Sequence, residues 1–237
     1  MISLKRTGYS FYGQPIGILC LDTKTERPLG HIKNAMTFDF PVRYKLVKGA
    51  TISRVVKEQD PKLLGPFVEA GRELEKEGVE AITTSCGFLS LFQEELASSL
   101  NVPVFTSSLL QIPMIHKMLR KNDRIGVITA DKGSLTERHL RACGWDPSIP
   151  IAIAGMENQE EFLSVIIEER KLAINPRRMR DEVVEVAKRL AKEERTVKAI
   201  VLECTDLSPF SSCVKQELDL PVFDIVTLTN YVYASLI

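Results

Sequence analysis

The sequence predicts an α/β protein made of two similar halves, each a short, mostly parallel sheet flanked by helices. Short apolar strands alternate with amphipathic helices along the chain, which is typical of parallel sheets covered by helices. Two stretches also look like copies of each other: VEAITTSCGFLS at 79–90 and VKAIVLECTDLS at 197–208. Each is followed, 17 residues after its cysteine, by Pro-Val-Phe. This shared offset of 118 residues indicates a duplicated structural unit.

The first half begins with a buried strand at 16–22, whose glycine precedes an aspartate by five residues. The same spacing returns at 125–131, so the opening strand is repeated as well. A long connection, 23–59, follows the first strand, and we expect it to form a loop or a β-ribbon over the site. Asp60 and Pro61 provide an N-cap and a first helical residue, which predicts a helix at 60–77.

The remaining elements follow from apolar periodicity and from turn residues. In the first half we expect a strand ending at the first cysteine of the pair, a helix at 88–100, a strand at 102–105 and a helix at 112–120. In the second half we expect strands at 125–129, 151–154, 198–203 and 221–225. Helices are expected at about 133–142, 158–169 and 176–193, after residue 205, and in the apolar tail 228–237.

Composition excludes several classes of function. Thirty-one basic residues balance 31 acidic ones, so the net charge does not favour binding to nucleic acid. The longest stretch free of charged residues, 96–116, contains two prolines and several polar residues and is a poor membrane span. The N-terminal stretch has no apolar core typical of a signal peptide. Five cysteines without a CxxC pair argue against a disulfide framework or a zinc site, so a cytoplasmic location is expected.

Cys86 and Cys204 are the strongest candidates for catalysis. Both follow strands at the sheet edge where ligands bind in parallel α/β folds. Each also precedes a helix, whose N-terminal N–H groups and dipole are expected to lower the pKa of the thiol and to hold a carboxylate. For the other three cysteines, burial in the core is the simpler expectation.

Polar residues near the two thiols, or in the long connection, are candidates for substrate binding. Hydroxyl groups flank both cysteines, the two opening strands end in polar residues, and an arginine in the connection suits a bidentate contact with a carboxylate. The candidates are Asp22, Thr84, Ser85, Gly87, Thr129, Thr205, Arg27 and Asn34. His31 lies in the same connection and is a weaker candidate. Asp22 and its counterpart Asp131 are equally compatible with ordinary turn formation.

Two thiols from equivalent halves suit the inversion of a carbon centre. One thiolate removes a proton from one face of the carbon, and the other thiol delivers a proton to the opposite face. Backbone donors can stabilise the enolate-like intermediate, so this chemistry requires no cofactor.

The sequence resembles the aspartate/glutamate racemase superfamily, through TTSCGF around Cys86, ECTDLSP around Cys204 and the Leu-x-x-Pro-Val stretches that follow each. The resemblance implies two Rossmann-like domains related by a pseudo-dyad, with the active site in the cleft between them. We place the first domain at 1–110 plus 226–237 and the second at 111–225. The resemblance also implies a cofactor-independent, metal-free racemase or epimerase that acts on a small carboxylate (an amino acid, a hydantoin or a related compound). It further implies a homodimer.

The chain departs from the racemase pattern at several positions. Glu203 precedes the second cysteine where the family usually has glycine, and Thr84-Ser85 replaces an Asn-Thr pair. The arylmalonate decarboxylases of the superfamily have one of the two cysteines, so the presence of both argues against that activity. Two alternatives remain: a maleate-type cis-trans isomerase with a nucleophilic cysteine, and a binding protein that retains the cleft without turnover.

Overall fold

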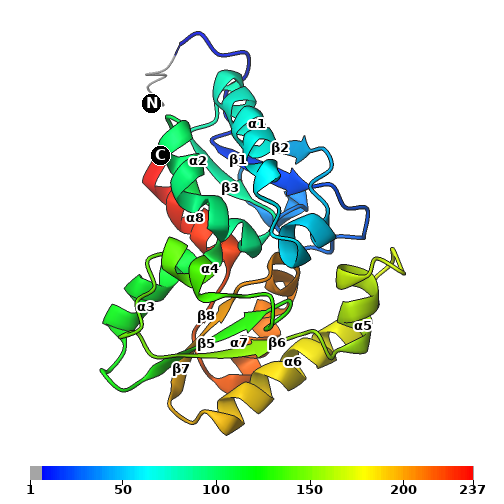
Figure 1. Ribbon diagram of the computed structural model, residues 1–237, viewed down its shortest axis with the longest axis vertical. Coiled ribbons are helices and arrows are strands. Elements are labelled where there is room, and N and C mark those ends of the chain that lie inside the picture. The colour runs from blue at the N-terminus through cyan, green and yellow to red at the C-terminus, as the bar shows by residue number, and fades with distance from the viewer. Residues whose placement is uncertain (1–6, 237) are drawn as a thin grey trace.

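The computed structural model describes residues 7–236 and contains two four-stranded parallel sheets with the same strand order. The first sheet has the order β2-β1-β3-β4, and the second has the order β6-β5-β7-β8. Each sheet is the centre of one lobe, and the two lobes lie one above the other (Figure 1). The prediction of an α/β fold with two similar parallel halves is confirmed.

The strands of the first lobe are β1 (Ile16–Leu21), β2 (Val42–Val47), β3 (Ala81–Thr84) and β4 (Val104–Phe105). Those of the second are β5 (Arg124–Thr129), β6 (Ile151–Gly155), β7 (Val197–Leu202) and β8 (Val222–Phe223). Strands β4 and β8 are separated by the same offset of 118 residues that relates the two cysteine stretches. The prediction of a possible ribbon in the long connection is wrong, because β2 pairs in parallel with β1 as an edge strand.

The long helices are α1 (Leu64–Glu77), α6 (Pro176–Glu193) and α8 (Ile225–Leu236). The shorter ones are α2 (Gln93–Ser99), α3 (Ile112–Met118), α4 (Glu137–Ala142), α5 (Glu160–Phe162) and α7 (Ser211–Leu218). Short 3-10 turns lie at Ala35–Thr37, Pro61–Leu63, Gly87–Phe92, Ser108–Gln111 and Thr205–Phe210, and π-helical turns at Ser53–Lys57 and Leu163–Ile167. The helix predicted at 88–100 is therefore a 3-10 turn followed by α2.

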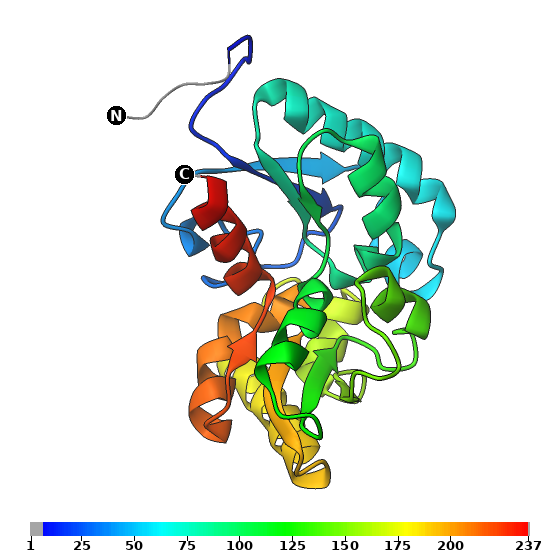
Figure 2. The ribbon, with the colours of Figure 1, turned by 90° about the vertical axis from the view of Figure 1, so that its left-hand side faces the viewer.

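Strand β1 shows how both faces of the first sheet are covered. Its side chains alternate, so Leu19 and Leu21 face the core that contains α1, while Ile16 and Ile18 face a second cluster. That second cluster includes residues of α8, which returns to the first lobe after the chain has completed the second (Figure 2). None of the helices within residues 7–236 is both long and apolar enough to cross a membrane.

The matched glycines of the two opening strands have the same structural role. A Cβ atom on Gly17 would lie 2.9 Å from the Leu74 side chain of α1. A Cβ atom on Gly126 would lie 3.0 Å from Leu190 of α6 and closer still to Ile200 of β7. Glycine at these positions lets a helix pack directly on the strand. The repeated spacing thus belongs to the packing of each lobe.

Candidate active site

Cys86 and Cys204 occupy equivalent places at the carboxyl ends of their sheets. Each lies two residues beyond a central strand, β3 or β7, and immediately before a six-residue 3-10 turn. The two segments touch, because Thr205 Oγ1 donates a hydrogen bond of 2.8 Å to the carbonyl oxygen of Ser85. The duplicated elements are therefore brought face to face across the boundary between the lobes.

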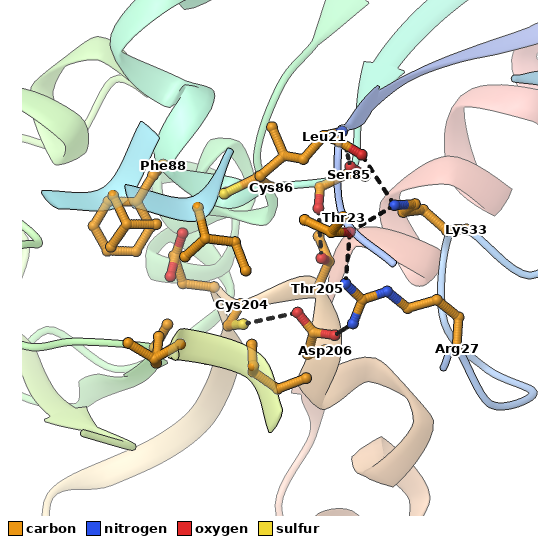
Figure 3. Close-up of a pocket in the computed structure, with 17 residues that line it drawn as sticks. Leu21, Thr23, Arg27, Lys33, Ser85, Cys86, Phe88, Cys204, Thr205 and Asp206 are labelled. Atoms are coloured by element: carbon orange, nitrogen blue, oxygen red, sulfur yellow. Dashed lines mark hydrogen bonds and ion pairs between the residues drawn. The ribbon is translucent and has the colours of Figure 1, made fainter. Parts of the chain in front are cut away.

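Both cysteines line one pocket with an empty volume of about 430 Å³, including its mouth. Figure 3 shows Lys33 and Arg27 on one side of this pocket and Phe88 on the other, with the sulfur atoms of Cys86 and Cys204 between them. The apolar part of the lining comes from both lobes. Within residues 7–236, no three His, Cys, Asp or Glu side chains form a group that could hold a metal ion.

The pocket brings together six of the candidate residues and leaves four outside its lining. The six that line the pocket are Arg27, Ser85, Cys86, Gly87, Cys204 and Thr205. The other four support the surrounding loops instead. Asp22 accepts from Gly49 N, and Thr84 Oγ1 donates to Thr106 O. Asn34 caps a 3-10 turn and donates to Arg27 O, and Thr129 Oγ1 donates to Glu203.

Four further polar residues of the lining were not among the candidates: Thr23, Lys33, Glu203 and Asp206. A usable signal existed for two of them, since Glu203 and Asp206 flank Cys204 and Glu203 departs from the racemase pattern. Lys33 lies in the same long connection as Arg27, but nothing in its sequence context distinguishes it from the other basic residues there. Its position depends on how the connection folds over the site.

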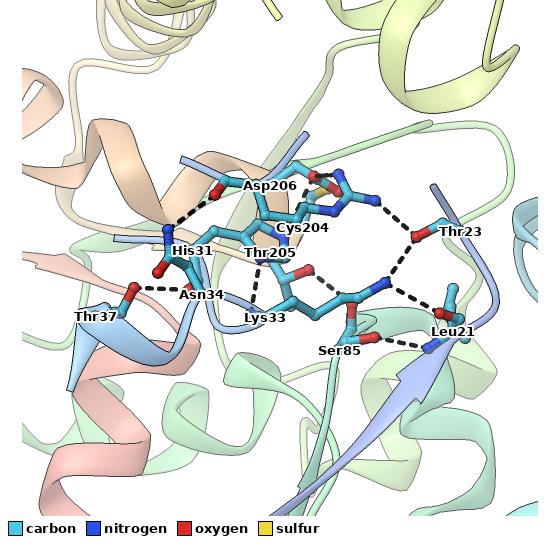
Figure 4. Close-up of polar contacts among 11 residues, drawn as sticks. Leu21, Thr23, His31, Lys33, Asn34, Thr37, Ser85, Cys204, Thr205 and Asp206 are labelled. Carbon is cyan, nitrogen blue, oxygen red and sulfur yellow. Dashed lines mark hydrogen bonds and ion pairs between the residues drawn. The ribbon is translucent and has the colours of Figure 1, made fainter. Parts of the chain in front are cut away.

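Asp206 joins the long connection to the second lobe. It forms an ion pair with Arg27 (Figure 3), and His31 Nε2 lies 3.3 Å from the same carboxyl oxygen (Figure 4). Burial opposes ionisation of Asp206, but the Arg27 guanidinium, together with His31, holds its pKa well below the usual range. The His31 ring is fully buried, which lowers its pKa, and its Nδ1 accepts a hydrogen bond from Lys33 N. His31 is therefore neutral near pH 7 and directs its Nε2 toward Asp206.

Lys33 carries a charge without an acidic partner among residues 7–236. Its Nζ donates to Leu21 O at 3.1 Å and to Thr23 Oγ1 at 2.8 Å, so both contacts are neutral acceptors. Burial and the nearby Arg27 lower the pKa of the amine from its ordinary value of 10.5. An anion in the pocket would relieve the repulsion between these two cations. Lys33 is thus a favourable position for a substrate carboxylate.

Glu203 is fully buried and only half satisfied. Its Oε2 accepts a hydrogen bond of 2.7 Å from Thr129 Oγ1, whereas Oε1 has no partner in the described structure. Burial raises the pKa of this carboxyl to about 7, against the hydrogen bonds from Thr129 and from Ala130 N. The side chain packs against the backbone of Gly87 in the other lobe, where any Cβ atom would overlap Oε1.

The pKa values of the two thiols are raised, whereas the sequence predicted that they would be lowered. The backbone N–H groups of Phe88 and Leu89 do favour the Cys86 thiolate, as expected at a helix N-terminus. Burial outweighs them, however, and the charge of Glu203 adds to it, so the pKa of Cys86 is raised. The pKa of Cys204 is raised well above its ordinary value by burial, by Asp206 and by Glu203. Both groups are therefore thiols near neutral pH.

Gly87→Ala is expected to destabilise the protein, because the new methyl group would overlap Glu203 Oε1 and the Glu203 carbonyl oxygen. Overpacking of this kind costs about 1 to 3 kcal/mol. Urea unfolding of the variant measures the loss. Gly65→Ala is the matched control, since no atom lies within 4 Å of a Cβ atom at that exposed helical position. Equal stability of Gly87→Ala and the wild type would contradict the close contact.

Glu203→Gln is expected to raise stability at neutral and alkaline pH. Because the pKa of Glu203 is about 7 in the folded protein and 4.5 ordinarily, the unfolded chain loses this proton first as the pH rises. The free energy of unfolding of the wild type therefore decreases as the pH rises from the ordinary pKa of 4.5 to the folded-state pKa of about 7, and it is constant at higher pH. The gain from the variant should be small below about pH 4 and reach up to about 3 kcal/mol above about pH 8. Urea unfolding at both pH values tests this, and a gain independent of pH would contradict it.

The fold and the pocket together define a two-lobed α/β protein that places one cysteine from each lobe at a shared site. A family model described as Asp/Glu/hydantoin racemase matches residues 110–229. The chain belongs to this family.

Proteins named for a different activity are among the relatives of this chain. Dimethylsulfoniopropionate lyase 7 from Emiliania huxleyi is 31% identical over 230 residues, which are 93% of this chain and 67% of that protein. A dimethylsulfoniopropionate lyase from Durusdinium sp. clade D is 30% identical over 223 residues, which are 91% of this chain and 73% of that protein. Among solved structures, aspartate racemase from Picrophilus torridus has a TM-score of 0.56 and 17% identity, and covers 89% of this chain and 88% of its own. This last likeness concerns the fold.

Proposed function

We propose that this protein is a thiol-dependent enzyme that removes a proton from the carbon next to the carboxylate of a small substrate, and that its reaction is β-elimination from dimethylsulfoniopropionate or a close analogue. The observation that carries the proposal is the placement of Cys86 and Cys204 at one pocket, with uncompensated charges of both signs in its lining. The relatives at about 30% identity, named as lyases of this substrate, support elimination over racemisation.

The substrate carboxylate is assigned to the side of the pocket formed by Lys33 and Arg27. Lys33 has only neutral acceptors as partners, so it attracts an anion more strongly than Arg27, whose charge is balanced by Asp206. A partly buried ammonium group has lost some of its hydrating water. A bound carboxylate stabilises it by supplying a charged hydrogen-bond acceptor in place of that water. This binding fixes the carbon next to the carboxylate between the two sulfur atoms.

The surroundings of the two cysteines favour Cys86 as the base. The Cys86 sulfur receives backbone N–H groups from Phe88 and Leu89, which stabilise a thiolate. Cys204 receives one such contact, from Asp206 N, but it also faces the Asp206 carboxylate, and its Sγ donates to Asp206 Oδ2 at 3.8 Å. Asp206 therefore holds Cys204 in the protonated form. We assign proton removal to Cys86. Cys204 is assigned the role of a proton donor or of an uncharged residue of the pocket lining.

The elimination is balanced without a further reactant. The Cys86 thiolate takes the proton from the carbon next to the carboxylate, and that bonding pair forms the new carbon–carbon double bond. The carbon–sulfur bond at the next carbon breaks, and its electron pair leaves with the neutral dimethyl sulfide. Acrylate remains, and the proton passes from Cys86 to solvent. The dimethylsulfonium cation also lowers the pKa of nearby thiols while it is bound, which offsets the effect of burial.

Racemisation or epimerisation of a small carboxylate is the second candidate. It is favoured by the equivalent positions of the two thiols, since inversion needs a proton carrier on each side of the carbon. The unequal partners of Cys86 and Cys204 fit this reaction less well than elimination, because a racemase runs both ways through similar groups. Both candidates share the first step, the removal of a proton beside a carboxylate.

Proton NMR in deuterated water separates the candidates. The protein is incubated with dimethylsulfoniopropionate and, separately, with a panel of amino acids, hydantoins and malonates. We expect dimethyl sulfide and acrylate from the first substrate. Deuterium incorporation with loss of optical activity in a member of the panel would identify the racemase. Absence of both conversion and exchange across all substrates would contradict the proposed function.

A further inference from the structure

The charges that line the pocket divide into one internal pair and two single charges. Four ionisable residues other than the cysteines line it: Arg27, Lys33, Glu203 and Asp206. Arg27 and Asp206 neutralise each other through their ion pair. Lys33 and Glu203 remain, and neither forms an ion pair within residues 7–236. A ligand that carries a negative and a positive group is the electrostatic complement of this arrangement.

Glu203 lines the pocket and has one carboxylate oxygen without a hydrogen-bond partner in the described structure. Thr129 holds Oε2, while Oε1 lies in the buried lining without a hydrogen-bond partner. A buried, unpaired carboxylate oxygen is costly, so structure alone gives no reason to keep an acid here. Gly87 supplies the space that the carboxylate needs at this position. A positively charged group bound beside Glu203 would therefore compensate a carboxylate that the protein itself leaves half satisfied.

The neighbouring aromatic ring favours a cation in the same place. Phe88 directly follows Gly87 and lines the pocket on the side away from Lys33 (Figure 3). Its ring is held edge-on to the His139 ring, with centroids 5.1 Å apart. An onium group with methyl substituents cannot donate strong hydrogen bonds, but it binds well between an aromatic face and an anionic oxygen.

We propose that Glu203, with Phe88, forms the subsite for a quaternary or sulfonium cation, so that the pocket selects zwitterions with a carboxylate at one end and an onium group at the other. This assignment rests on the proposed function for the orientation of the substrate. Glu203 thereby determines specificity, and it touches the leaving group and not the proton that is removed. The bound cation also cancels the negative charge that raises the pKa of both thiols, so the right substrate activates its own base.

Calorimetric binding to two inert ligands tests the subsite directly. The first ligand is trimethylammoniopropionate. The second has the same shape and the same carboxylate, but an uncharged carbon atom replaces the positively charged nitrogen. We expect wild-type protein to prefer the cation about tenfold or more, because an ion pair in a desolvated site exceeds the effect of shape alone. Glu203→Gln should bind both ligands about equally, and Glu203→Asp should recover part of the preference.

Glu161→Gln is the matched control, because Glu161 is also buried but lies outside the pocket lining, where it binds Asn175 N. It should keep the wild-type preference. Thermal unfolding confirms that each variant is folded. A preference retained in Glu203→Gln, or a wild-type protein that binds neither ligand or both equally, would overturn the subsite. If the wild-type protein catalyses elimination but Glu203→Gln keeps the wild-type preference for the cationic ligand, the subsite is rejected and the proposed function stands. A Glu203-dependent preference without turnover of any substrate would support the subsite and reject the proposed function.

Discussion

Cys86→Ser is expected to lower kcat/KM for elimination about a thousandfold or more, because a serine hydroxyl is a far weaker base than a thiol at the same position. The change removes one sulfur atom and leaves the size of the pocket almost unchanged. Conversion of dimethylsulfoniopropionate, followed by NMR, measures the loss. A variant that retains wild-type turnover would exclude Cys86 as the base.

Cys204→Ser distinguishes the two candidate reactions. Elimination needs one base, so this variant should lose about tenfold and still release dimethyl sulfide. Racemisation needs both thiols, so the same variant would lose inversion completely while retaining one-sided proton exchange. Cys213→Ser is the control, since Cys213 lies in α7 outside the pocket lining. Loss of elimination in the control would show that the assay reports on folding and not on the site.

Asp206→Ala is expected to have the largest effect on stability, about 3 to 5 kcal/mol, because it leaves the Arg27 guanidinium buried without its partner. Both side chains are mostly buried, with 11% and 14% of their surface exposed. The depressed pKa of Asp206 means that the pair stabilises the fold at neutral pH, and that this contribution declines as the pH falls below the ordinary value of 3.8. Urea unfolding at about pH 7 measures the difference.

The double variant Arg27→Met with Asp206→Ala is the control for this prediction. Because it removes both charges, it should recover most of the stability that the single change loses. A single variant within about 1 kcal/mol of the wild type would show that water or another group satisfies Arg27. The same pair connects the long loop of the first lobe to the second lobe, so its loss should also raise KM.

The architecture follows closely from the sequence because its signals are local. The repeated glycines at 17 and 126 allow helices to pack on the opening strands, and the repeated Pro-Val-Phe stretches become β4 and β8. Each of these features involves residues near one another in the chain. The placement of both cysteines beyond central strands follows from the same pattern, since parallel strands end at a common edge.

The details of the site depend on contacts between residues far apart in the sequence. Asp206 meets Arg27, 179 residues earlier, and Lys33 reaches the pocket through the fold of a loop that has no periodic pattern. The predicted lowering of the thiol pKa is wrong for the same reason: helix position is a local property, whereas burial and the approach of Glu203 are not.

The sequence by itself determined the duplicated parallel sheets and the position of one thiol at the ligand edge of each. Only the tertiary structure decided the direction of the Glu203 side chain. Its side chain packs against Gly87 of the opposite lobe, and the residue lines the pocket. The physical reason is that alternation assigns a side chain to one face of its own sheet, whereas the backbone that Glu203 packs against there is supplied by the other lobe.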